Sequence, residues 1–123
     1  MEIISTNKAP QAIGPYSQAY EANGFIFTSG QIAIDPSDGT IKASSIEEQT
    51  EQVCKNVSEI LKAAGSGMEN VVKTTCFLAN MEDFAAFNGI YEKYFVSKPA
   101  RSCVAVKQLP KNVLCEVEAI AVK

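Results

Sequence analysis

Residues 114–122 read LCEVEAIAV, and their alternation decides which kind of fold this chain adopts. Successive side chains of an extended strand point to opposite faces of the sheet. One face is apolar and suits a core beneath helices; it comprises Cys115, Val117, Ala119 and Ala121. The other face mixes carboxylates with aliphatic groups: Glu116, Glu118, Ile120 and Val122. A mixed face of this kind suits a subunit interface that encloses a polar pocket.

The rest of the chain supplies the partners of this strand. Short strands are expected at residues 2–5 and on either side of Asn23-Gly24, a strong hairpin signal. Residues 70–79 (NVVKTTCFLA) and 101–109 (RSCVAVKQL) read as further strands, the latter separated from the last strand by a turn at residues 110–112. Gly30 ends or bulges the strand that precedes it.

Two segments have the apolar periodicity of amphipathic helices. The first is residues 46–64, with a capping box formed by Ser45 and Glu48 and a stop at Gly65. The second is residues 81–95 (MEDFAAFNGIYEKYF), with an aromatic stripe of Phe84, Phe87, Tyr91 and Tyr94. The order β-β-β-α-β-α-β-β predicts a single α+β domain over residues 1–123, with one six-stranded sheet and two helices on one of its faces.

Composition narrows the function classes. A net charge of −3 and the absence of any basic cluster argue against nucleic-acid binding. The chain has no histidine, which excludes Ser-His-Asp and Cys-His catalysis, and its four cysteines form no C-x-x-C pair of the kind that binds zinc. No zinc site is therefore expected. The cysteines have apolar neighbours and are expected to be reduced, which together with the lack of a signal pattern or apolar span indicates a cytoplasmic protein.

Arg101 is the only arginine among eleven cationic residues. A guanidinium presents a rigid fork of donors that fits a carboxylate with two hydrogen bonds, which a lysine cannot do. Two interpretations are open. Arg101 binds the carboxylate of a ligand, or it forms a cross-strand ion pair with Glu116, since the turn between the last two strands could pair them.

Other polar residues have equally ordinary structural interpretations. Tyr16 after Gly-Pro is typical of a packed turn aromatic, and Ser29 of a hydroxyl at a strand end. Asn88 on the second helix is typical of a surface or capping group, and Cys103 of a small strand filler. Taken singly, none of these residues predicts a functional site.

Taken together, the motifs IGPYSQ, TSGQI, VVKTTCFLA, FNGIYEKYF, PARSCVAV and CEVEAIAVK, in that order, closely resemble the RidA/YjgF family of reactive intermediate deaminases. The resemblance extends from about residue 9 to residue 123. It implies a chorismate mutase-like fold and a homotrimer whose sheets face inward, whose helices lie outside, and whose pockets lie at the subunit interfaces.

The resemblance also implies an activity and a set of site residues. Members of the family hydrolyse small 2-imino acids, such as 2-iminobutanoate and 2-iminopropanoate, to 2-keto acids and ammonia without a cofactor. By this resemblance Arg101 binds the substrate carboxylate and Glu116 holds or activates water. The remaining positions that line the family's pocket are Tyr16, Ser29, Gly30, Asn88 and Cys103.

Two other functions stay open at this stage. A non-catalytic trimer that binds a small carboxylate metabolite and regulates a partner would use the same pocket. A ribonuclease or translation inhibitor is a further interpretation, although the acidic pI of about 5.0, the single arginine and the lack of histidine argue against it.

Overall fold

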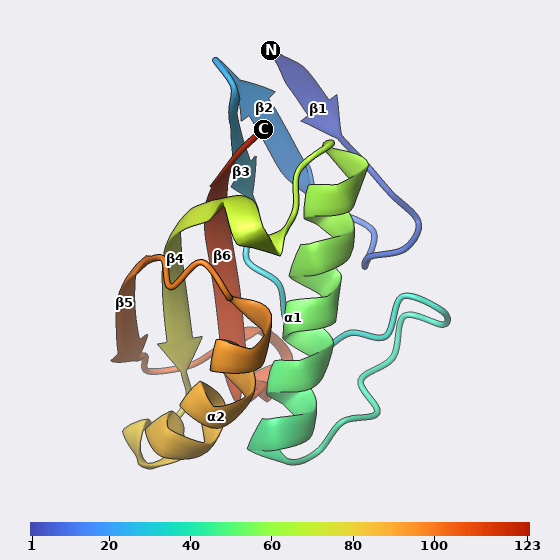
Figure 1. The fold of residues 1–123 in the computed structure, drawn as a ribbon. Helices are drawn as coiled ribbons and strands as arrows, with labels where there is room; N and C mark the ends of the chain where they lie inside the picture. The colour runs from blue at the N-terminus through green and yellow to red at the C-terminus, as the bar shows by residue number, and fades with distance from the viewer.

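The computed structural model describes all of residues 1–123 and contains one six-stranded sheet with two α-helices (Figure 1). The strands are β1 (Glu2–Ile4), β2 (Ala19–Ala22), β3 (Phe25–Thr28), β4 (Val71–Leu78), β5 (Ala100–Ala105) and β6 (Cys115–Val122). The helices are α1 (Ile46–Ala63) and α2 (Phe84–Tyr94), and short 3-10 turns are η1 (Met68–Asn70), η2 (Met81–Asp83) and η3 (Pro110–Asn112). The predicted order of elements is confirmed, except that the second helix begins after η2.

The strands lie in the order β1-β2-β3-β6-β4-β5. The sheet is mixed, because it contains one parallel pair. Neighbours are antiparallel except for β4 and β5, which are parallel because the α2 crossover returns the chain in the same direction. The prediction that the last two strands could pair is wrong, because β4 lies between β5 and β6. The ion pair that was considered between Arg101 and Glu116 is accordingly absent.

Both helices cover the same face of the sheet and lie side by side against it (Figure 1). The core between the two layers includes α1 residues that are fully buried: Val53, Cys54, Val57, Ile60 and Leu61. Each large aliphatic side chain in such a core contributes roughly 1.5–3 kcal/mol relative to an exposed one. The predicted apolar face of β6 is confirmed, since Cys115, Val117, Ala119 and Ala121 are all buried in this core.

Local sequence signals set the ends of the main elements as predicted. The Ser45 hydroxyl accepts a hydrogen bond from the Glu48 amide, and the Glu48 carboxylate accepts one from the Ser45 amide, which completes the capping box of α1. Beyond the helix, Gly65 has a φ of 79°, the left-handed conformation that glycine adopts without steric cost. At the hairpin between β2 and β3, Asn23 and Gly24 have φ values of 53° and 80°, as a tight two-residue turn requires.

The face of the sheet opposite the helices has no cover within one chain. Large apolar side chains on this face are exposed: Tyr20, Phe25, Phe27 and Val104. Glu116 and Glu118 lie on the same face, opposite Phe77 and Thr75 of β4. The predicted mixed face is therefore present, and it is open to solvent in the isolated chain.

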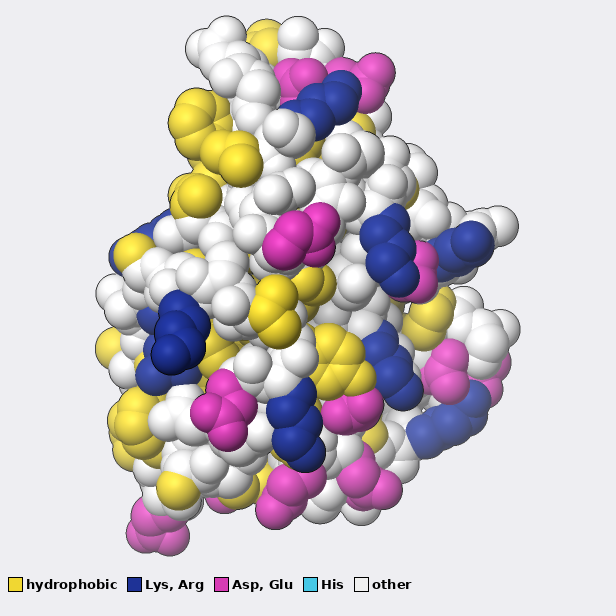
Figure 2. All heavy atoms as spheres, viewed as in Figure 1, with side chains coloured by type: hydrophobic (Ala, Val, Ile, Leu, Met, Phe, Trp, Pro, Cys, Tyr) yellow, Lys and Arg dark blue, Asp and Glu magenta, His cyan; other side chains and the backbone are white.

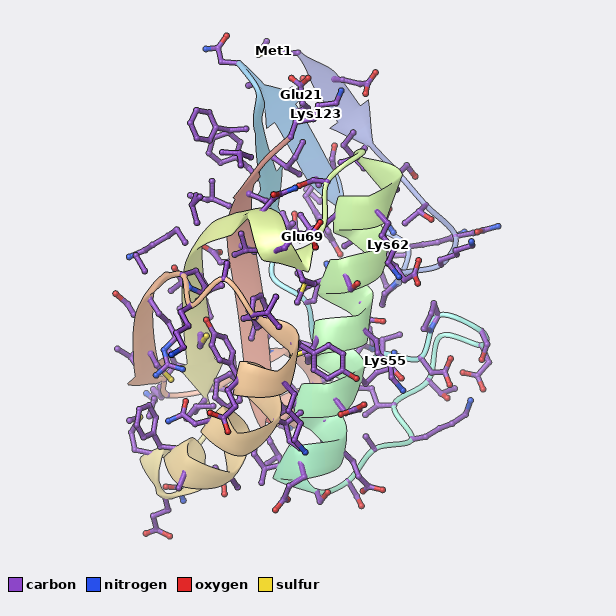
Figure 3. All side chains as sticks on the ribbon, viewed as in Figure 1. Met1, Glu21, Lys55, Lys62, Glu69 and Lys123 are labelled. Carbon is purple, nitrogen blue, oxygen red and sulfur yellow. The ribbon has the colours of Figure 1, made fainter.

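The helix-bearing face is a solvated surface of both charge signs (Figure 2). Lys55 and Lys62 project from α1, where they pair with Glu51 and Glu59 at 3.9 Å and 3.7 Å (Figure 3). Exposed pairs of this kind contribute little to stability. A membrane-spanning helix needs a long run of apolar residues, and neither α1 nor α2 has one.

Candidate functional site

A cavity of about 620 Å³, which we call the glutamate pocket, is lined by most of the expected site residues. Its lining includes Gly30 and the polar or charged side chains of Tyr16, Ser29, Lys111, Glu116 and Glu118. Paired backbone hydrogen bonds between Gln31 and Val117, of 2.8 Å and 3.1 Å, fasten the segment after β3 to β6. The expected residues from three separate segments, at positions 16, 29–30 and 116, therefore converge on one cavity.

Glu116 lies directly over the backbone of Gly30. A Cβ atom on Gly30 would overlap Oε2 of Glu116 and would lie 2.9 Å from its Cδ, so only glycine leaves room for the carboxylate here. The Glu116 carboxylate has no hydrogen-bond or ion-pair partner in the chain and is therefore free to bind a ligand or water. Burial, together with the negative charge of Glu118, raises its pKa above the ordinary value of 4.5. A carboxylate with a raised pKa is a stronger base than an exposed one.

Two neighbouring groups border this carboxylate. The Ser29 hydroxyl donates a 2.6 Å hydrogen bond to the backbone carbonyl of Ser17, so it presents its oxygen lone pairs, not its proton, to other partners. Tyr16 is 53% exposed, so the interpretation as a packed turn aromatic does not hold within one chain. Both residues are available to a ligand, Ser29 as an acceptor and Tyr16 through its ring or hydroxyl.

A second cavity, of about 670 Å³, which we call the arginine pocket, lies between α2 and β5. Arg101 and Asn88 are both part of its lining. The guanidinium Nη1 donates a 2.7 Å hydrogen bond to Oδ1 of Asn88. Because a guanidinium only donates, the amide oxygen of Asn88 faces it, and the amide NH₂ remains free to donate to a ligand. The remaining N–H groups of Arg101 have no partner in the chain.

Cys103 belongs to the lining of neither cavity. It lies two residues after Arg101 on the same face of β5, paired in register with Cys76 of β4, and is half-buried against the core. Burial raises the pKa of its thiol above 9.0, and the nearby Arg101 only partly offsets this. The thiol is therefore protonated at neutral pH and is a poor nucleophile. None of the four cysteines forms a disulfide.

The two pockets lie on opposite faces of the sheet. Arg101 is in register with Thr74, which is buried on the helix side, whereas Glu116 is in register with Phe77 on the uncovered side. The expected site residues are therefore divided into two sets within one chain: Tyr16, Ser29, Gly30 and Glu116 in one pocket, Asn88 and Arg101 in the other. One chain does not bring its own arginine and glutamate together.

Sequence reasoning missed several residues of these pockets. The alternation of the last strand places Glu118 only on its mixed face, yet Glu118 lines the glutamate pocket. The sequence places Lys111 only in a turn. In the structure it has a φ of 54° within η3, and it lines the same pocket. Tyr91 was assigned to the core stripe of the second helix, and its ring also faces Arg101. The spacing of Asn88 and Tyr91, three residues apart on a helix, is a signal that could have linked the two. No cluster of histidine, cysteine, aspartate or glutamate side chains is arranged to hold a metal ion.

Comparison with known families gives the pattern of motifs and pockets a name. Residues 6–123 match the family described as endoribonuclease L-PSP. The chain belongs to this family. The family includes proteins named as members of the Rid family and the YjgF product of Escherichia coli, so the resemblance to the RidA/YjgF family is confirmed.

Relatives within the endoribonuclease L-PSP family match this chain over almost its whole length. A Lactococcus lactis protein named as a candidate regulator, AldR, is 57% identical over 98% of this chain and 97% of its own. The 2-iminobutanoate/2-iminopropanoate deaminase of Mus musculus is 50% identical over 99% of this chain and 91% of its own. Escherichia coli TdcF, whose crystal structure has bound serine, is 41% identical in sequence to this chain. The two structures superpose with a TM-score of 0.95, over 100% of this chain and 99% of that one.

Proposed function

We propose that this protein is a hydrolytic deaminase that converts small 2-imino acids, such as 2-iminobutanoate and 2-iminopropanoate, to 2-keto acids and ammonia. The observation that carries the proposal is the division of the site into an arginine pocket and a glutamate pocket of opposite charge. A 2-iminium acid has a carboxylate at one end and a cationic nitrogen beside it. It therefore complements the two pockets when they meet.

Assembly is the step that would bring the pockets together. The uncovered sheet face, with exposed Tyr20, Phe25, Phe27 and Val104, resembles an interface more than a solvated surface. We propose a homotrimer with the sheets inward, in which the arginine pocket of one subunit meets the glutamate pocket of the next. Each of three equivalent sites would then contain residues from two chains.

The residues of such a site account for the chemistry. The Arg101 fork binds the substrate carboxylate, and the free amide NH₂ of Asn88 adds a donor beside it. Fixing the substrate in this way holds its electrophilic carbon next to the glutamate pocket. The acceptor lone pairs of the Ser29 hydroxyl suit an iminium N–H group.

Glu116 is the proposed general base. It removes a proton from water as the water oxygen attacks the iminium carbon, and it returns the proton to nitrogen in the tetrahedral adduct. The C–N bond then breaks as Glu116 takes the remaining hydroxyl proton, which passes to the departing ammonia, so that the iminium and water give the keto acid and an ammonium ion. The iminium carbon is already electrophilic, so no cofactor is required, and general acid–base assistance is worth roughly 10²- to 10⁴-fold.

The names of the relatives support this assignment. The murine relative is named as a deaminase of the same two imines. TdcF was crystallised with bound serine, an amino acid with a carboxylate next to a nitrogen-bearing carbon. The four unpaired thiols support a reducing compartment, and we propose the cytoplasm.

The activity is tested by adding the protein to a pyridoxal phosphate-dependent dehydratase that releases 2-iminobutanoate from threonine. We expect faster formation of 2-oxobutanoate than with the dehydratase alone. An unchanged rate at excess protein would contradict the proposed activity. Light scattering at micromolar concentration should give three times the mass of one chain, and a monomer would contradict the proposed assembly.

Mixing two inactive variants tests whether each site draws on two chains. Homotrimers of Arg101→Ala and of Glu116→Gln should each be impaired. Co-expressed chains should regain about a quarter of wild-type activity, because one interface in four then pairs an intact Arg101 with an intact Glu116 from its neighbour. Recovery would be absent if each chain carried a whole site of its own.

A second candidate function is a trimer that binds a carboxylate metabolite and regulates a partner. The observation that favours it is the 57% identity to the candidate regulator AldR. This function predicts ligand binding by calorimetry with no acceleration of imine hydrolysis. A ribonuclease is less favoured, because two carboxylates in the glutamate pocket would repel a phosphate backbone.

A further inference from the structure

The guanidinium of Arg101 lies against two aromatic rings of α2. Its Cζ atom is 4.9 Å from the centroid of the Tyr91 ring and 5.4 Å from that of the Phe84 ring. Both distances are within the range of about 6 Å over which a cation is attracted to an aromatic face. Phe84, Asn88 and Tyr91 stand at positions i, i+4 and i+7 of one helix, so a single stripe contacts the guanidinium through two rings and one amide oxygen.

The Tyr91 ring is itself held firmly. It stacks on Phe95 with a centroid separation of 4.4 Å, and Phe87 packs at 5.6 Å. Its hydroxyl shares a buried 2.7 Å hydrogen bond with Thr74, the residue of β4 that is in register with Arg101. The ring is thus fastened to the strand beside the arginine as well as to its own helix, and it has little freedom to turn away.

The arginine, by contrast, is only half-buried and has a long, flexible side chain. Binding a carboxylate through two hydrogen bonds requires the guanidinium plane to be fixed in one orientation. Asn88 alone restrains one nitrogen and leaves rotation about that contact open. The two rings restrain the plane itself, while its unpaired N–H groups remain open to the arginine pocket.

We propose that Phe84 and Tyr91 are positioning residues that hold the guanidinium plane of Arg101 ready for a ligand carboxylate. The proposal rests on the proposed function in that it takes Arg101 as the carboxylate-binding group. The role proposed for the two rings is exerted through the arginine, whose guanidinium they pack against. Without them Arg101 keeps its charge but samples more orientations, and its selectivity for a planar carboxylate falls.

The test compares binding of 2-oxobutanoate with binding of 2-oxobutanamide by titration calorimetry. The amide has the same size but cannot accept the two charge-assisted hydrogen bonds, so the ratio of the two Kd values measures the carboxylate recognition alone. In Phe84→Leu and Tyr91→Leu the preference for the acid should fall roughly 3- to 30-fold. Tyr91→Phe keeps the ring and should retain most of the preference.

Phe87→Leu is the matched control, because Phe87 is a buried aromatic of α2 that packs on Tyr91 and makes no contact with the guanidinium. It should weaken stability while leaving the ratio of Kd values unchanged. The partly buried Phe84 carries the test if Tyr91→Leu does not fold. An unchanged ratio in Phe84→Leu, or an equal fall in Phe87→Leu, overturns the proposal.

The outcome is separate from that of the proposed activity. A wild-type protein that prefers the acid but hydrolyses no imine would refute the deaminase assignment and leave the positioning role measurable. A wild-type protein with no preference for the acid over the amide would overturn the positioning role directly.

Discussion

Replacing Gly30 with alanine should displace the side chain of Glu116 while the glutamate itself stays unmutated. The added methyl carbon would overlap Oε2 of Glu116 and would lie 2.9 Å from Cδ and 3.1 Å from Cγ. Gly30 does not have a positive φ, so alanine fits its backbone without strain. The side chain of Glu116, which has no partner to break, must rotate out of the pocket.

The size of the effect follows from these contacts. Displacing a free, half-buried carboxylate costs little folding energy, and we expect the free energy of unfolding to change by no more than about 0.5 kcal/mol. The loss of a positioned general base should lower kcat by roughly 10²- to 10⁴-fold. Binding of 2-oxobutanoate should change much less, because its carboxylate is bound by Arg101.

Gly89→Ala is the matched control, since a Cβ atom there meets nothing within 4 Å. Gly89 lies inside α2, where alanine is more favourable than glycine by about 0.5–1 kcal/mol, so this variant should be active and slightly more stable. The assay is the dehydratase-coupled formation of 2-oxobutanoate, with thermal unfolding in parallel. Wild-type kcat in a folded Gly30→Ala protein would refute the role given to the Glu116 position.

Three further predictions concern single side chains. Arg101→Lys keeps the charge but loses the fork, and we expect kcat/KM to fall roughly 10- to 150-fold; near-wild-type hydrolysis with an altered oligomer mass would make Arg101 a structural cation. Cys103→Ser should keep most of the activity, because the thiol is protonated and hydrolysis needs no covalent intermediate, whereas a loss as deep as that of Arg101→Ala would contradict this. Burial and the charge of Glu118 raise the pKa of Glu116, so kcat/KM should fall as the pH drops through that raised pKa. Glu118→Gln removes the neighbouring charge and should shift this acidic limb of the kcat/KM profile to lower pH. An unmoved acidic limb would speak against Glu116 as the base.

Local patterns determined the elements of this protein because they act between residues close in sequence. The capping box of Ser45 and Glu48, the Asn23-Gly24 turn and the alternation of β6 each depend on backbone geometry within a few residues. They predicted the α+β class, the helix at residues 46–64 and the apolar face of β6. The motifs alone also indicated the family, because their order along the chain survives without coordinates.

Which elements become neighbours depends on long-range packing, and here the sequence was insufficient. The short turn at residues 110–112 allowed β5 to pair with β6. The helical crossover through α2 instead makes β5 parallel to β4, and β6 pairs with the other edge of β4. That arrangement turns Arg101 toward the helices and Glu116 toward the uncovered face. The family resemblance named these two residues as one site, whereas the tertiary structure separated them into two pockets, because side chains on opposite faces of a sheet point away from each other and cannot meet within one chain.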